Sequence, residues 1–191
     1  MSEIAAKIKE NYNSKWQVFT VSEASSFLYT GRVERHTLNE NQIYQWQKDV
    51  LKTIQQLESV YDNIADHETA RHTLIICDRG GMDPKAYTPG EDTWNKILEE
   101  LQTDEKQLLE RYHIVIQMHT APKEFYSTVN NPYRRENYDE AAEINQKYEK
   151  LWRNHHNFHS VDNFDARDQQ DGWAKKSKQV YQHIKNIIDE N

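Results

Sequence analysis

The sequence predicts an α/β protein in which helices cover both faces of a parallel β-sheet. Short apolar, β-branched segments alternate along the chain with longer segments whose apolar residues recur at helical spacing. Strands that alternate with helices form βαβ units, which assemble into a parallel sheet covered on both sides. The chain has 191 residues, and we therefore expect a single domain over residues 1–191.

Four segments are expected to be strands because they are short and rich in β-branched or aromatic residues. They are residues 16–21, 73–77, 113–118 and 158–161. Segments with a helical apolar period are expected to be helices. They are residues 2–14, 41–65, 138–154 and 168–188, with two short helices between 92 and 110. Asn39 is a candidate N-cap. The uninterrupted apolar run of 73–77 is typical of a strand buried on both faces.

Charge and cysteine usage exclude some classes of function. The formal net charge of −7 opposes nonspecific binding to nucleic acid. The one cysteine, Cys77, allows no intrachain disulfide and indicates a reducing compartment. No apolar stretch is long enough to form a transmembrane segment or a signal peptide. We therefore expect a cytoplasmic protein.

The carboxyl ends of the predicted strands carry the candidate site residues, because ligands of open parallel sheets lie beyond these ends. The residues that follow the four strands, in order, are Glu23, then Asp78 and Arg79, then His119 and Thr120, and last Asp162 and Asn163. Asp78 could hold Mg²⁺ or accept a proton. Arg79 could bind a phosphate through its planar guanidinium group. Glu23 could act as a base toward a hydroxyl group.

A second basic pair, Arg134 and Arg135, precedes a predicted helix and could close over phosphates. Together with the strand ends, these arginines would complete a phosphoryl-transfer site. A simpler interpretation stays open. Asp78 and Arg79 could be a turn with a surface ion pair, and the arginine pair could be a solvated helix start.

The segment from Cys77 to Tyr87 resembles the Asp-Arg-Gly, Met-Asp, Ala-Tyr signature of the NadR-type AAA domains. These P-loop NTPase domains occur in the TRPL translocation defect proteins and, more distantly, in the nicotinamide riboside kinase part of NadR. In this signature Gly80, Asp83 and Tyr87 would be structural residues. Weaker similarity continues at 18–24, 131–136 and 152–163, so that the resemblance spans roughly residues 8–185.

The resemblance implies a three-layer P-loop-kinase-like fold that binds GTP or ATP with Mg²⁺. It also implies links to phosphoinositide binding and to membrane-protein trafficking. Asp78 would be the acid on the metal side, and Glu23 would face the acceptor or the metal shell. Arg79, together with Arg134 and Arg135, would face phosphates. Asn163 would lie near the base.

The chain departs from this family because it contains no Gly-x-x-x-x-Gly-Lys-[Ser/Thr] motif. Residues 2–14 match the helix that follows that loop, so we expect the first strand and the P-loop to be missing. One hypothesis is a degenerate nucleotide-binding domain without turnover. A second is an N-terminally incomplete small-molecule kinase whose P-loop lies upstream. A third is a non-catalytic protein-interaction module.

The missing first strand would lie between residues 73–77 and 113–118. Its absence would leave backbone donors and acceptors unpaired on both neighbours, at a cost of about 1–3 kcal/mol for each buried group. We therefore expect these two strands to pair directly, or water or another chain to fill the gap.

Overall fold

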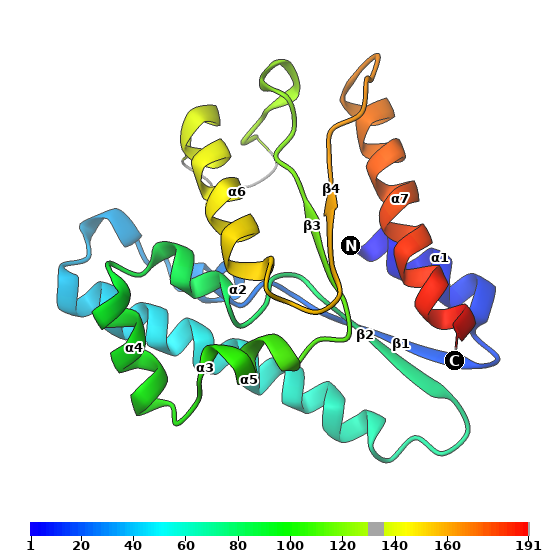
Figure 1. The fold of residues 1–191 in the computed structure, drawn as a ribbon, viewed down its shortest axis with the longest axis horizontal. Helices are drawn as coiled ribbons and strands as arrows, with labels where there is room; N and C mark the ends of the chain where they lie inside the picture. Colours follow the sequence, from blue (N-terminus) through cyan, green and yellow to red (C-terminus); the bar gives the residue numbers. More distant parts are fainter. Residues whose placement is uncertain (130–135, 191) are drawn as a thin grey trace. The chain divides into compact units, whose positions relative to one another are not determined.

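The computed structural model describes residues 1–129 and 136–190. The chain is a mixed α/β protein that divides into two units, Met1–Arg111 and Tyr112–Asn191. Each unit holds one two-stranded parallel sheet (Figure 1). The mixed α/β class predicted from the sequence is confirmed, whereas the single domain, the three-layer arrangement and the missing first strand stay predictions.

The first unit places helices around the parallel pair β1 and β2, which is in register from Trp16 opposite His72 to Val21 opposite Cys77. Its elements are α1 (Ser2–Tyr12), β1 (Trp16–Val21), α2 (Ala24–Tyr29), η1 (Arg35–Thr37), α3 (Glu40–Ala65), β2 (His72–Cys77), η2 (Asp83–Tyr87), α4 (Glu91–Glu100) and α5 (Glu105–Glu110). The strand β1 has the predicted bounds, whereas the sequence analysis did not predict α2.

The long helix α3 begins as its sequence predicts. The Asn39 side chain accepts a hydrogen bond from Gln42 N at 3.0 Å, and the Gln42 side chain accepts one from Asn39 N at 2.9 Å. This capping box pairs two of the backbone N–H groups that a helix start leaves free. Further along α3, Val50 and Ile54 pack with Ala24 of α2 in a buried cluster. This packing explains why six residues with little helical signal form α2.

The second unit pairs β3 with β4 in parallel, from Val115 opposite Phe158 to Met118 opposite Val161. Its elements are β3 (Val115–Met118), η3 (Lys123–Phe125), α6 (Tyr138–Trp152), β4 (Phe158–Val161) and α7 (Gln169–Glu190). The apolar stripe of α7 is buried at Val180, Ile184 and Ile188. Trp173, which the pattern places on the same stripe, is 42% exposed. The buried apolar residues of the stripe therefore lie in the C-terminal half of α7.

The described ladders pair β1 with β2 and β3 with β4. Because β2 and β3 belong to different units, the expected pairing of residues 73–77 with 113–118, or the filling of a gap between them, stays a prediction. One expectation about β2 is wrong. The side chains of β2 are exposed or half-buried rather than buried on both faces. Within the described residues of the first unit, β2 has a strand neighbour on one edge only, so its side chains lack the cover of a second flanking strand. Finally, no helix in the described ranges is both long and apolar enough to cross a bilayer.

Candidate functional site

The parallel register of the first unit brings Glu23, Asp78 and Arg79 to one edge of its sheet. Val21 and Cys77 lie opposite each other at the carboxyl ends of β1 and β2. Asp78 N then donates a hydrogen bond to Val21 O at 2.8 Å, which continues the ladder by one residue. The three predicted side chains therefore follow neighbouring strands at the position where open α/β sheets bind ligands.

The backbone at Arg79 adopts a left-handed conformation, with a φ of 80°. This conformation is uncommon for a residue with a Cβ atom and often marks turns at functional positions. It directs the chain out of β2 into the following turn. The Arg79 guanidinium Nε lies 3.7 Å from Glu23 Oε1, and the two side chains are 31% and 27% exposed. This ion pair joins the ends of the two strands.

A buried carboxylate organises the turn after Arg79. Asp83 is only 8% exposed, and its Oδ2 accepts a hydrogen bond from Gly80 N at 3.0 Å. Next to it, Met82 is almost completely buried. The turn that carries Arg79 is therefore anchored by a side-chain acceptor within the protein.

The 3-10 helix η2 ends at Tyr87, which contacts Arg35 of η1. The Tyr87 carbonyl accepts a hydrogen bond from Arg35 Nη2 at 3.2 Å, and the guanidinium carbon lies 4.6 Å from the centre of the Tyr87 ring. Tyr87 therefore connects η2 to the segment that follows α2.

The electrostatic environment of Asp78 favours its protonated form. Surrounding protein atoms partly desolvate the carboxylate and raise its pKa, although the side chain keeps access to solvent. The positive charge of Arg79 opposes this shift, and the negative charge of Glu23 adds to it. A carboxylate with a raised pKa gains from a nearby cation, and such groups are common at ligand sites.

Glu23 is held by two hydroxyl groups that the sequence analysis missed. Ser25 Oγ donates to Glu23 Oε1 at 2.8 Å, and Ser26 Oγ donates to Oε2 at 2.6 Å. Glu23 is also the N-cap residue of α2. Serines two and three residues after an acidic residue are close enough in the chain to donate to its carboxylate, and this was the signal that could have revealed them.

A magnesium ion at this edge would find two carboxylates, on Asp78 and Glu23. Within the described residues, no group of three His, Cys, Asp or Glu side chains is arranged to hold a metal ion. Two carboxylates suit Mg²⁺ only where water and phosphate oxygens complete its six ligands, which is the usual arrangement at nucleotide sites. The residues therefore fit a metal that arrives with a phosphate ligand.

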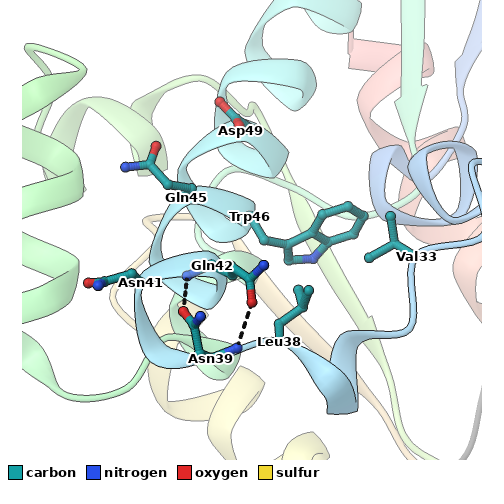
Figure 2. Close-up of a pocket in the computed structure, with 8 residues that line it drawn as sticks. All are labelled: Val33, Leu38, Asn39, Asn41, Gln42, Gln45, Trp46 and Asp49. Atoms are coloured by element: carbon teal, nitrogen blue, oxygen red, sulfur yellow. Dashed lines mark hydrogen bonds between the residues drawn. The ribbon is translucent and has the colours of Figure 1, made fainter.

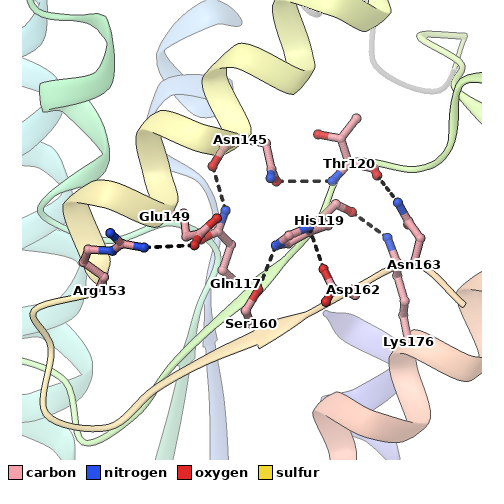
Figure 3. Close-up of polar contacts among 10 residues, drawn as sticks. All are labelled: Gln117, His119, Thr120, Asn145, Glu149, Arg153, Ser160, Asp162, Asn163 and Lys176. Carbon is pink, nitrogen blue, oxygen red and sulfur yellow. Dashed lines mark hydrogen bonds and ion pairs between the residues drawn. The ribbon is translucent and has the colours of Figure 1, made fainter.

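The remaining predicted residues follow the first unit in the sequence. Asn163 belongs to the second unit, where its Nδ2 donates to Thr120 O at 2.8 Å and links the ends of β3 and β4 (Figure 3). Arg134 and Arg135 lie outside the described residues, so their predicted role at phosphates stays a prediction.

An open pocket in the first unit involves none of the predicted site residues (Figure 2). It is lined by Val33, Leu38, Asn39, Asn41, Gln42, Gln45, Trp46 and Asp49. The Trp46 indole points toward Val33, while Asn39 and Gln42 bind each other in the capping box (Figure 2). Sequence reasoning missed this pocket because its polar residues have the pattern of an ordinary solvated helix start.

Comparison with known families identifies the chain. The family model described as an AAA domain matches residues 2–167. The chain belongs to this AAA domain family. Searches of curated proteins and of solved structures gave no significant match.

The AAA domain match covers the four strands of the described residues and the Glu23, Asp78 and Arg79 edge, and it ends just before α7. Membership in this family supports a P-loop-like nucleotide-binding function. It agrees with the broader part of the resemblance predicted from residues 77–87.

Proposed function

We propose that the carboxyl edge of β1 and β2 binds the phosphate groups of a magnesium nucleotide, either GTP or ATP. The observation that carries the proposal is the grouping of Asp78, Arg79 and Glu23 at this edge in an AAA domain chain. Arg79 would bind a phosphate oxygen, and Asp78 would bind the Mg²⁺ ion, directly or through water.

The expected affinity is low. Most P-loop proteins hold phosphates with the backbone amides of a glycine-rich loop and with its lysine, and this sequence lacks that motif. One arginine and one metal-bound carboxylate provide much less binding energy, so we expect a dissociation constant of roughly millimolar size. We expect no phosphoryl transfer from the chain as it stands.

The finer parts of the proposal rest on the resemblance of residues 77–87 alone. They are the binding of GTP, the binding of phosphoinositides and a role in membrane-protein trafficking. Phosphoinositide headgroups and nucleotides share the phosphate chemistry that Arg79 could recognise. Vesicles with and without phosphoinositide, mixed with the protein and sedimented, would test that link separately.

Thermal unfolding in the presence of MgGTP or MgATP tests the main proposal. At a ligand concentration of ten times the dissociation constant, binding stabilises the folded state by about 1.4 kcal/mol. The Asp78→Asn and Arg79→Ala variants should lose this stabilisation. Arg71→Ala is the matched control, because Arg71 pairs with Glu68 just before the amino end of β2. No shift at several millimolar nucleotide, or equal shifts in all variants, would refute nucleotide binding at this edge.

The Arg79–Glu23 ion pair favours a second candidate, a protein-interaction module without nucleotide. In that case both side chains would serve the local turn, and the surface would bind a partner protein. The same titration separates the two functions, since an interaction module would show no magnesium-dependent response to nucleotide.

A further inference from the structure

The register of the second sheet places four polar side chains on one of its faces. Gln117 of β3 lies opposite Ser160 of β4. Side chains alternate between the two faces of a strand, so His119 shares the face of Gln117, and Asp162 shares the face of Ser160. The last pair in the register is Met118 opposite Val161. His119 and Asp162 are the next residues of the two strands and therefore lie opposite each other, with Ser160 diagonal to His119.

The imidazole of His119 lies between the side chains of Ser160 and Asp162 and contacts both of them (Figure 3). His119 Nδ1 lies 2.9 Å from Asp162 Oδ1, and His119 Nε2 lies 2.7 Å from Ser160 Oγ. A carboxylate can only accept hydrogen bonds, so the Nδ1 nitrogen donates to Asp162 in this arrangement. In the neutral imidazole, Nε2 is then an acceptor for the Ser160 hydroxyl proton.

We propose that Ser160 is an activated nucleophile, with His119 as its general base and Asp162 as the residue that positions His119. A hydroxyl, an imidazole and a carboxylate joined in this order are the arrangement that activates serine in acyl-transfer enzymes of unrelated folds. The chemical class of substrate is a small ester with a good leaving group. This inference is independent of nucleotide binding, because all three residues belong to the second unit.

The reaction would follow the usual course of serine acylation. The Ser160 O–H proton passes to His119 Nε2 while Oγ forms a bond to the carbonyl carbon, whose π-electron pair moves onto its oxygen. Return of that pair breaks the bond to the leaving alkoxide, which takes the proton from His119. Water then attacks the acyl-serine with the same base, releasing the acid and restoring Ser160.

The surroundings of the three residues leave Ser160 open to a substrate and hold the backbone of His119 in place. Ser160 is exposed, so a small ester can reach its hydroxyl group. The backbone of His119 is held by Lys176, a largely buried residue of α7 whose Nζ donates to His119 O at 2.5 Å. Asp162 is 75% exposed, and solvent therefore weakens its effect on the imidazole. We accordingly expect modest acceleration rather than efficient turnover.

Labelling of the full chain with a fluorophosphonate tests the proposal. The Ser160 Oγ displaces fluoride from phosphorus, and intact mass with peptide mapping gives the rate and the residue. We expect preferential labelling of Ser160 and a rate about 10²-fold lower in His119→Gln, which has no general base. Asp162→Asn should lower the rate about two- to fivefold, as expected for an exposed charge.

The matched control serine is Ser127, whose Oγ accepts a hydrogen bond from Val129 N and makes no hydrogen bond to a histidine among the described residues. Ser160→Ala should abolish labelling, whereas Ser127→Ala should leave the rate unchanged. Thermal unfolding of each variant is measured in parallel. If His119→Gln does not fold, Asp162→Asn decides the question, because that side chain is largely exposed. Labelling of Ser160 no faster than of Ser127, or an unchanged rate in Asp162→Asn, would overturn the proposal.

Discussion

Arg79 and Glu23 form an ion pair of 3.7 Å between the ends of two neighbouring parallel strands. The pair joins a strained turn after β2 to the N-cap of α2. Both side chains are about one third exposed to solvent, so a phosphate group could reach the guanidinium without unfolding the turn.

The coupling energy between Glu23 and Arg79 should therefore be small. We expect a double-mutant cycle of Glu23→Gln and Arg79→Gln to give less than about 1 kcal/mol in urea unfolding, because the pair is long and solvent-accessible. The coupling should also decrease as salt is added. A value of several kcal/mol would show that the pair is mainly structural and would weaken the case for a phosphate at Arg79.

Asp83 should be more important for stability than either member of that pair. Asp83→Ala leaves the buried Gly80 N–H without its carboxylate acceptor, which should lower the free energy of unfolding by about 1–3 kcal/mol. Asp83→Asn keeps a side-chain oxygen and should cost less. Urea denaturation of the three proteins measures the difference. Equal stability of the alanine variant would mean that water replaces the carboxylate.

Asp78 should destabilise the folded protein at neutral pH. Its pKa in the folded state is raised above the ordinary value of 3.8 by desolvation, with Glu23 adding to the shift. The folded state thus binds the proton more tightly, and stability falls as pH rises from the ordinary value through the raised one.

Asp78→Asn should consequently be more stable than the wild type at pH 7, by up to about 1 kcal/mol for this solvent-accessible group. The gain should disappear near pH 3, where the carboxyl group is protonated in both states. Thermal unfolding at the two pH values checks this. The same variant should lose nucleotide binding, so a gain in stability without that loss would separate the two roles.

Cys77 should react slowly with alkylating reagents. Partial burial, and then the negative charges of Glu58 and Asp62, raise the pKa of its thiol from 9.0 to about 12. The thiolate is the reactive species, so at pH 8 the folded protein should react about 10³-fold more slowly than unfolded chain. Iodoacetamide labelling with and without urea, followed by mass spectrometry, measures the ratio. Equal rates would show that the thiol is freely accessible to solvent and base.

Local patterns in the sequence were enough to predict most elements. The strands at 16–21 and 158–161 have the predicted bounds, and Asn39 caps α3 as expected. These features depend on residues within one or two turns of each other, such as the capping partners Asn39 and Gln42. The helix α2 was missed because its stability comes from Ala24 packing against α3, a contact that no short window contains.

The candidate site likewise depends in part on local sequence and in part on tertiary structure. The sequence alone determined that acidic and basic residues follow the strands, at Glu23, Asp78 and Arg79, because strand ends can be recognised from apolar runs. Only the tertiary structure decided which ends are neighbours and how they meet. Register between β1 and β2 brings Arg79 to Glu23, and register between β3 and β4 brings His119 to Ser160 and Asp162. Pairing between distant segments depends on backbone hydrogen bonds and packing across the whole chain, which the order of residues within one segment does not specify.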